Sequence, residues 1–178
     1  YKANRSEAPD DLVPQFEFIR KSVLAFNLPS VELINYEADD LIATYTDKIL
    51  KEGAKVTIVS SDKDLMQLYR KNVRIFDPMK NKFISDEDVK NKFGVDSSKV
   101  IDVQALAGDS SDNVPGVPRI GIKTAAELIN KYGNLEKLLK SAHEIKQNKR
   151  RETLIENKNK AIISKKLVTL KHDSPVES

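Results

Sequence analysis

The chain has 178 residues, of which 39% are hydrophobic and 32% are charged, a composition typical of a soluble globular protein with one sizeable core. Its apolar runs fall short of the roughly 18 residues that a membrane span needs, and its beginning has no signal-peptide pattern. Cysteine is absent, which excludes disulfides and thiolate metal sites. We therefore expect a cytoplasmic protein with no membrane partner.

The net charge of +3 hides an asymmetry. Residues 1–118 carry 16 Lys and Arg against 20 Asp and Glu, whereas residues 119–172 carry 14 against 5. This division suggests an anionic partner that the basic part holds and the acidic part acts on. A solvated helix surface is the ordinary explanation for Lys-rich helices, so charge alone decides nothing.

The first part of the chain alternates helical and strand patterns. Helices are expected at residues 10–27, 38–49, 65–69, 86–93 and 98–107. Strands are expected at residues 31–34, 56–59 and 73–76. The second strand is apolar except for Thr57, as a buried parallel strand should be. The alternation predicts an α/β fold with a parallel sheet flanked by helices.

After the turn-rich residues 108–121 only helices are expected, at residues 122–131, 135–142 and 149–170. We therefore expect an α/β core over residues 1–107 and a helical module over residues 108–178. The chain starts at Tyr1 inside a basic, turn-rich stretch, which suggests a piece cut from a longer protein.

Acidic side chains gather in three clusters. They are Glu37, Asp39 and Asp40, then Asp62 and Asp64, then Asp109 and Asp112. The first two clusters each follow a predicted strand, and ligands collect at the carboxyl ends of strands in open sheets. Asp62 and Asp64, two apart in extended chain, should point to the same side.

So many carboxylates in one place repel one another unless cations neutralise them. Oxygen ligands without Cys or His suit Mg²⁺ or Mn²⁺, and two such ions can support phosphodiester hydrolysis. Helix capping is the alternative for Asp39, Asp40 and Asp112. A second carboxylate beside a strand end, as at Asp62 and Asp64, has no expected capping duty. In a regular helix Glu37 and Asp39 would point about 200° apart, so they share a site only at a fanned first turn.

Residues 116–126 have the form of a hairpin between helices. Two glycines allow a tight bend, and the amides that open the next helix can bind a phosphate without reading a base. Such turns also occur without a ligand, but the basic helices behind this one favour DNA. The candidate DNA-binding residues are Gly116, Val117, Arg119, Gly121, Lys123 and Thr124.

The runs YKANR, YEADD, SSDKDL and GDSSDNVPGVPRIGIKTA together resemble the 5′-nuclease domain of bacterial DNA polymerase I, within the flap endonuclease family. The resemblance covers the whole chain in order, and its ending LVTLKHDSPVE is similar to the point where that domain runs into the polymerase. It implies a PIN-like α/β fold with a helix-three-turn-helix (helix-hairpin-helix) module.

The resemblance also implies a two-metal nuclease that cuts 5′ flaps, nicked or gapped duplex and RNA primers on DNA. All seven acidic residues above would be metal-site carboxylates, with Asp39, Asp62, Asp64 and Asp109 forming the second metal site. Lys2 and Arg5 match the basic residues that steer the scissile phosphate. The hairpin, over residues 114–121, would bind K⁺ through carbonyl oxygens. A lone nuclease domain of this kind is expected to be a monomer.

The chain departs from the family pattern at three places. Two aspartates of the family lie upstream of Tyr1 and are absent. We therefore expect the first metal site to be crippled, so that the chain binds DNA but cleaves it weakly. The sheet should also have an exposed edge or an apolar groove. Arg119 and Ile122 stand where a glycine and a polar residue are expected.

A non-catalytic DNA-binding module is the main alternative function. A phosphoryl-acceptor domain is a weaker one, because it leaves the hairpin unexplained.

Overall fold

A computed structural model describes residues 7–176 of the chain. Its α-helices are α1 (Gln15–Ala25), α2 (Ala38–Lys51), α3 (Asp86–Phe93), α4 (Val100–Ala107), α5 (Ile122–Tyr132), α6 (Leu135–Lys140), α7 (Asn148–Glu156) and α8 (Lys158–Val168). The strands are β1 (Val56–Val59), β2 (Val73–Asp77) and β3 (Lys82–Phe83). Short 3₁₀ helices are η1 (Lys63–Leu68), η2 (Ser97–Lys99) and η3 (Ala142–Glu144).

The sheet has the order β1-β2-β3, with β1 parallel to β2 and β2 antiparallel to β3. The α/β architecture is confirmed, but the sheet is mixed rather than parallel, because a tight turn after β2 returns the chain directly beside it. β1 is an edge strand in which only Ile58 is buried. The expectation of a fully buried strand was wrong, since Val59 is 65% exposed. An apolar groove of about 390 Å³ lies between α2 and β1, so the expected edge and groove are both present.

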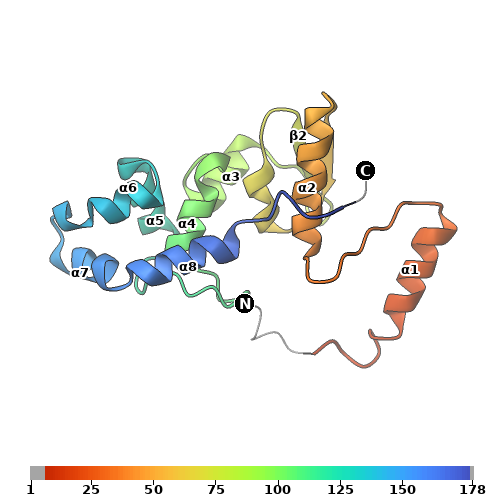
Figure 1. Ribbon diagram of the computed structural model, residues 1–178, viewed down its shortest axis with the longest axis horizontal. Helices are drawn as coiled ribbons and strands as arrows, with labels where there is room; N and C mark the ends of the chain where they lie inside the picture. Colours follow the sequence, from red (N-terminus) through yellow and green to blue (C-terminus); the bar gives the residue numbers. More distant parts are fainter. Residues whose placement is uncertain (1–6, 177–178) are drawn as a thin grey trace.

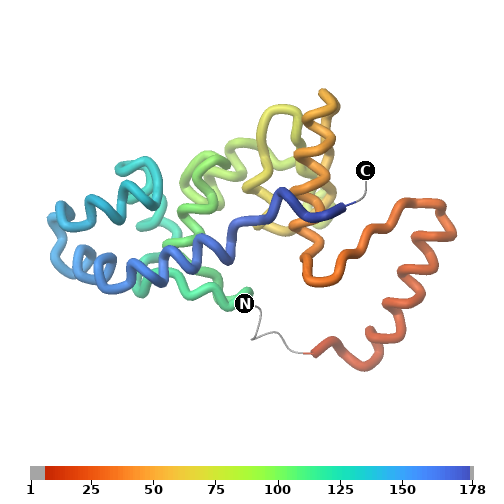
Figure 2. The backbone as a smooth tube through the Cα atoms, viewed as in Figure 1, coloured from red at the N-terminus to blue at the C-terminus, as the bar shows by residue number. Residues whose placement is uncertain are grey.

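The strand expected at residues 31–34 is wrong. These residues form no strand, and Ile34 is 86% exposed. Their β-branched side chains favour a strand only when a neighbouring strand pairs with them, and the described part of the chain offers none. The preceding helix α1 is confirmed, although it starts later than expected, with Pro14 as its N-cap residue. α1 buries no residue and stands apart from the other helices (Figures 1 and 2).

The core centres on α4. Val100, Val103 and Leu106 are fully inaccessible to solvent, because α5 and α8 pack on this helix from different sides. Figure 1 shows α4 to α8 gathered at one end of the molecule, with α2 and the sheet beside them. Within residues 7–176 no helix combines the length and apolarity needed to cross a membrane. The domain boundary after residue 107 stays a prediction.

The single long helix expected at residues 149–170 is in fact two helices, α7 and α8, which meet at Asn157. Asn157 donates from its side chain to the carbonyl of Thr153 at 2.9 Å, a local bond by which asparagine competes with regular helix. The break lets Ala161, Ser164 and Val168 of α8 turn into the core. The other predicted helices agree with the structure within a few residues, although α6 ends at Lys140 and 65–69 is the 3₁₀ helix η1.

Candidate active site and nucleic-acid interface

Asp62 and Asp64 lie at the start of η1, directly after β1. The Asp62 carboxylate accepts a hydrogen bond from the amide of Asp64 at 2.9 Å, so Asp62 caps η1. The expectation that the pair has no capping duty was therefore wrong for Asp62, and the expectation of extended chain was wrong for Asp64, which lies within η1. Gln104, from α4, donates to Asp64 Oδ1 at 2.7 Å. Burial raises the pKa of Asp64, and the charges of Asp62 and Asp112 raise it further, against the bond from Gln104.

Asp109 and Lys63 lie side by side in the lining of a cleft of about 310 Å³, which Gln104 and Ser111 also line. Lys63 forms an ion pair with Asp109 Oδ2, and the Ser111 amide donates to Asp109 Oδ1 at 2.9 Å. Burial alone would raise the pKa of Asp109, but these two bonds lower it below its ordinary value. Burial likewise acts to lower the pKa of Lys63, yet the Asp109 carboxylate raises it. The second and third acidic clusters are thus brought together around one lysine.

The first cluster opens α2. Glu37 is the N-cap residue in extended backbone, and Asp40 Oδ2 accepts from the Glu37 amide at 3.4 Å. The other oxygen, Asp40 Oδ1, accepts from the backbone amide of Lys171 at 2.9 Å. The Asp40 carboxylate therefore accepts from two backbone amides. The bond from Glu37 is the helix capping expected as the alternative, whereas the bond from Lys171 joins α2 to the segment after α8. Asp39 lies beside it in the first turn.

The chemistry of the second and third acidic clusters fits a hard divalent cation, because their donors are carboxylate oxygens. Burial first, and then the charges of Asp62 and Asp112, raise the pKa of Asp64, and a bound cation would offset both effects. Among residues 7–176, however, no three Asp, Glu, His or Cys side chains converge closely enough to hold a metal ion. Lys63 supplies the positive charge at Asp109 instead. The seven predicted metal ligands stay a prediction.

The hairpin is built onto the third acidic cluster. Asp109 and Val114 exchange backbone hydrogen bonds of 2.9 and 2.7 Å, which close the loop between them. Gly116 has a φ of 59°, and a Cβ placed there would lie 2.4 Å from the Gly108 nitrogen. Only glycine fits this crossing. The Gly116 amide donates to Ser164 Oγ of α8 at 2.9 Å, which ties the turn to the helices behind it.

The second glycine of the hairpin has a different role from the one expected. Gly121 has a φ of −88° and open space where a Cβ would lie, so the bend does not require it. It is the N-cap residue of α5 without a side-chain hydrogen bond to the helix amides. Val117 is buried, whereas Arg119 and Lys123 are exposed and Thr124 is half-buried. Arg119 shares a small hollow with Lys149 and Arg150 of α7.

Two site residues escaped prediction, and two predicted ones lie outside the described part of the chain. Lys63 was visible between Asp62 and Asp64 in the sequence. Gln104 could have been noticed as a polar residue in an apolar helix, and it is 2% exposed. Lys2 and Arg5 lie outside the described residues. A groove of about 610 Å³ between α6 and α8 contains none of the predicted site residues.

Comparison with known protein families assigns both parts of the chain. A profile described as "5′-3′ exonuclease, N-terminal resolvase-like domain" matches residues 1–94, and one described as "5′-3′ exonuclease, C-terminal SAM fold" matches residues 95–178. DNA polymerase I of Rhizobium leguminosarum is 55% identical over 99% of the chain, and the 5′-3′ exonuclease of Aquifex aeolicus is 41% identical over 99%. The chain spans only 17% and 60% of those proteins.

Solved structures agree in fold. The T5 D15 protein co-crystallised with metal ions superposes with a TM-score of 0.81 over 94% of this chain and 66% of that one, at 24% identity. A T5 5′-exonuclease with bound zinc gives a TM-score of 0.79 over 94% of this chain and 63% of that one, at 26% identity. The catalytic core of Rad2 in complex with DNA gives 0.57 over 97% and 59%, at 18% identity. From its profile matches along the full length, the chain belongs to the 5′-3′ exonuclease family.

Proposed function

We propose that this chain is the 5′-nuclease part of a DNA polymerase I and acts on the phosphodiester backbone of DNA. The main observation behind this proposal is the backbone bridge between Asp109 and Val114, which joins the third acidic cluster and the hairpin in one loop. A duplex held on the hairpin would therefore lie at a set distance from the carboxylates. The proposed substrates are 5′ flaps, nicked or gapped duplex, and RNA primers on DNA.

The hairpin would hold duplex by its backbone. The first amides of α5 lack a side-chain cap, and helix N-termini of this kind bind phosphates. Arg119, Lys149 and Arg150 line one hollow beside the turn, which adds positive charge without base contacts. We also propose that carbonyl oxygens in residues 114–121 bind K⁺ and that Lys2 and Arg5 steer the scissile phosphate.

The carboxylates would hold Mg²⁺ or Mn²⁺. Asp62, Asp64, Asp109 and Asp112 are the first candidates, because Asp64 feels the charges of Asp62 and Asp112 while Lys63 binds Asp109. Glu37 and Asp39 would join them from α2. When bound, two divalent ions would supply positive charge that stabilises the attacking and leaving oxygens. Gln104 fixes the Asp64 carboxylate, and Lys63 would have to leave Asp109 to open the site.

The proposal is tested by cleavage of a labelled 5′-flap duplex with Mg²⁺ or Mn²⁺, beside binding of the same duplex in Ca²⁺. We expect binding to be clear and cleavage weak, with Asp62→Ala removing whatever cleavage occurs. Asp96→Ala is the control, since Asp96 lies outside the acidic cluster. Binding with no cleavage by any preparation would favour a non-catalytic DNA-binding module. A chain that is folded but binds no duplex would overturn the proposal. We further propose that the chain is cytoplasmic and monomeric. Sedimentation would test the monomer, and cell fractionation would test the location.

A further inference from the structure

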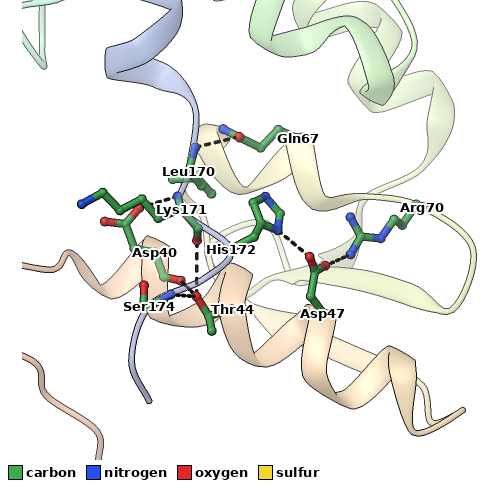
Figure 3. A network of polar contacts seen from close by, with 9 residues as sticks. All are labelled: Asp40, Thr44, Asp47, Gln67, Arg70, Leu170, Lys171, His172 and Ser174. Atoms are coloured by element: carbon green, nitrogen blue, oxygen red, sulfur yellow. Dashed lines mark hydrogen bonds and ion pairs between the residues drawn. The ribbon is translucent and has the colours of Figure 1, made fainter.

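The segment after α8, which we call the strap (residues 169–176), crosses to the acidic end of the molecule and lies along α2 (Figure 3). It bonds to α2 and to η1, the two elements that carry the first and second acidic clusters. These contacts join residues more than a hundred positions apart in the chain.

Thr44 is the attachment point at the middle of α2. It is polar yet only 2% exposed. Its Oγ1 accepts from the Ser174 amide at 3.1 Å and lies 3.4 Å from the Lys171 carbonyl. Ser174 is itself buried. Loss of the Thr44 hydroxyl would leave a buried amide without an acceptor, which is costly.

Two consecutive backbone amides of the strap donate hydrogen bonds, one to the first acidic cluster and one to η1, which carries the second cluster. The Lys171 amide donates to Asp40 Oδ1 at 2.9 Å, in the same turn as Asp39. The neighbouring Leu170 amide donates to Gln67 Oε1 at 3.2 Å. Gln67 in turn donates to the Asp64 carbonyl at 2.9 Å and to the Val168 carbonyl at 3.1 Å. Because adjacent Cα atoms are about 3.8 Å apart, these bonds set the spacing between the first turn of α2 and η1.

Two outer contacts complete the attachment, and Figure 3 shows the one between His172 and Asp47. His172 Nδ1 lies 2.8 Å from Asp47 Oδ2, and Asp47 also pairs with Arg70. Lys48 Nζ donates to the Val176 carbonyl at 2.8 Å. The other end of the strap continues α8, which packs on α4 and holds Gly116 of the hairpin through Ser164. The strap is thus a physical connection between the hairpin module and the acidic end.

We propose that the strap is a positioning device, which fixes the first turn of α2, with Glu37 and Asp39, relative to η1, with Asp62 and Asp64, as joint metal binding by these side chains would require. The proposal rests on the proposed metal site. Thr44 and Gln67 are the positioning residues, because they touch the strap and not the metal. By linkage, a metal ion that binds across α2 and η1 must also hold the strap more firmly in place.

The test compares Thr44→Val with Thr46→Val. Thr46 lies on the same helix, is 1% exposed, and has no hydrogen bond to the strap among residues 7–176. We expect the Ser174 amide to exchange hydrogen about tenfold faster in Thr44→Val than in the control, and Mn²⁺ to bind about three- to tenfold more weakly by calorimetry. Duplex binding in EDTA should differ by less than about twofold, since the hairpin is unchanged. In the unaltered chain, Mn²⁺ should slow exchange of the same amide.

A second variant, Gln67→Met, removes the other attachment and should weaken Mn²⁺ binding in the same direction. If circular dichroism shows that Thr44→Val does not fold, the Mn²⁺ affinity of Gln67→Met tests the positioning role instead. Faster exchange with unchanged Mn²⁺ affinity would overturn the positioning role. A Ser174 amide that exchanges freely in the unaltered chain would overturn the strap itself. Failure of the unaltered chain to bind Mn²⁺ at all would instead sink the proposed metal site, and the positioning role with it.

Discussion

Arg119 combines an exposed charge with a backbone conformation that suits glycine. Its φ is 65°, in the left-handed region that costs a non-glycine residue roughly 1–2 kcal/mol. The neighbouring Lys149 and Arg150 share its hollow, so the guanidinium lies where positive charge collects. The residue therefore lowers stability while it adds charge at the hairpin.

Arg119→Gly should raise the free energy of unfolding by about 0.5–1 kcal/mol, because the relieved backbone strain exceeds the entropy that glycine adds to the unfolded chain. It should also weaken duplex binding. Arg119→Ala separates the two effects, since alanine loses the charge and keeps the strain. Urea titrations and duplex-binding curves of both variants measure this. Equal stability of the glycine and alanine variants would show that the backbone is not strained.

Asp77 ties the ends of β1 and β2 together, and its pKa makes the tie sensitive to acid. The Ser61 hydroxyl donates to Asp77 Oδ1 at 2.7 Å, and this bond, with those from Lys80, lowers the pKa of Asp77 to about 2. A carboxyl group with a lowered folded-state pKa stabilises the protein above its ordinary pKa of about 3.9. That contribution is lost as the pH falls toward 2.

Asp77→Asn should therefore flatten the fall in unfolding free energy between pH 4 and pH 2, because the variant has no carboxyl to protonate. Ser61→Ala should make the same fall smaller and let it end at a higher pH, since it removes the bond that most lowers the folded-state pKa of Asp77. Urea denaturation at half-unit pH steps measures both. An unaltered slope in Asp77→Asn would contradict the assignment.

At the scale of elements, α3 shows local chemistry and core packing acting together. Ser85 Oγ accepts from the Asp88 amide at 3.1 Å, and Asp88 Oδ2 accepts from the Ser85 amide at 2.9 Å, a complete capping box. The helix ends at Gly94 with a φ of 71°. Between these ends Val89 and Phe93 enter the core. The helix begins and ends where its sequence signals predict.

Ser85→Ala should lower the free energy of unfolding by about 1 kcal/mol, since the capping box loses the hydroxyl that accepts from the helix amide. In a chain of this size that corresponds to a fall in Tm of roughly 2–4 °C. Ser98→Ala is the matched control, because the Ser98 side chain is exposed and makes no hydrogen bond within residues 7–176. Calorimetry distinguishes them. Equal Tm values for the two variants would show that the capping box contributes nothing.

At the scale of the molecule, the charge asymmetry maps onto the two ends of the structure. Residues 119–172 carry 14 Lys and Arg against 5 Asp and Glu, and they form the hairpin end and α5 to α8. The carboxylate clusters of residues 37–112 lie at the start of α2, at the start of η1 and in the loop after α4. Duplex binding should therefore depend mainly on the hairpin end, through phosphate contacts that release counterions.

Arg119→Ala with Arg150→Ala should lower the slope of log affinity against log salt by about 1–2, at roughly 0.9 for each phosphate that the variant no longer neutralises. The control is Lys51→Ala with Lys55→Ala, which removes the same charge from the end of α2 and the loop before β1. Fluorescence anisotropy of a labelled duplex over a salt series gives both slopes. If the two double variants had the same slope, the hairpin would not be the binding surface.

Local sequence signals determined several helices, the turn at Gly116 and the family of this protein. Residues 86–93 and 38–49 are helical because their apolar spacing and their first-turn acidic residues act within a few positions along the chain. The acidic and glycine-rich motifs also identified the family, since they depend on residue type and order. Gly116 adopts the left-handed turn that its sequence context predicted.

Tertiary contacts determined where expected elements failed to form and which distant side chains meet, because these contacts join residues far apart in the sequence. Residues 31–34 have strand propensity but no strand beside them in the described part of the chain, and the helix expected at 149–170 breaks at Asn157 so that α8 can pack on α4. Asp40 holds an amide 131 positions away, and Gln104 holds Asp64 from 40 positions away. Such bonds depend on where the folded chain returns, and no local pattern encodes that.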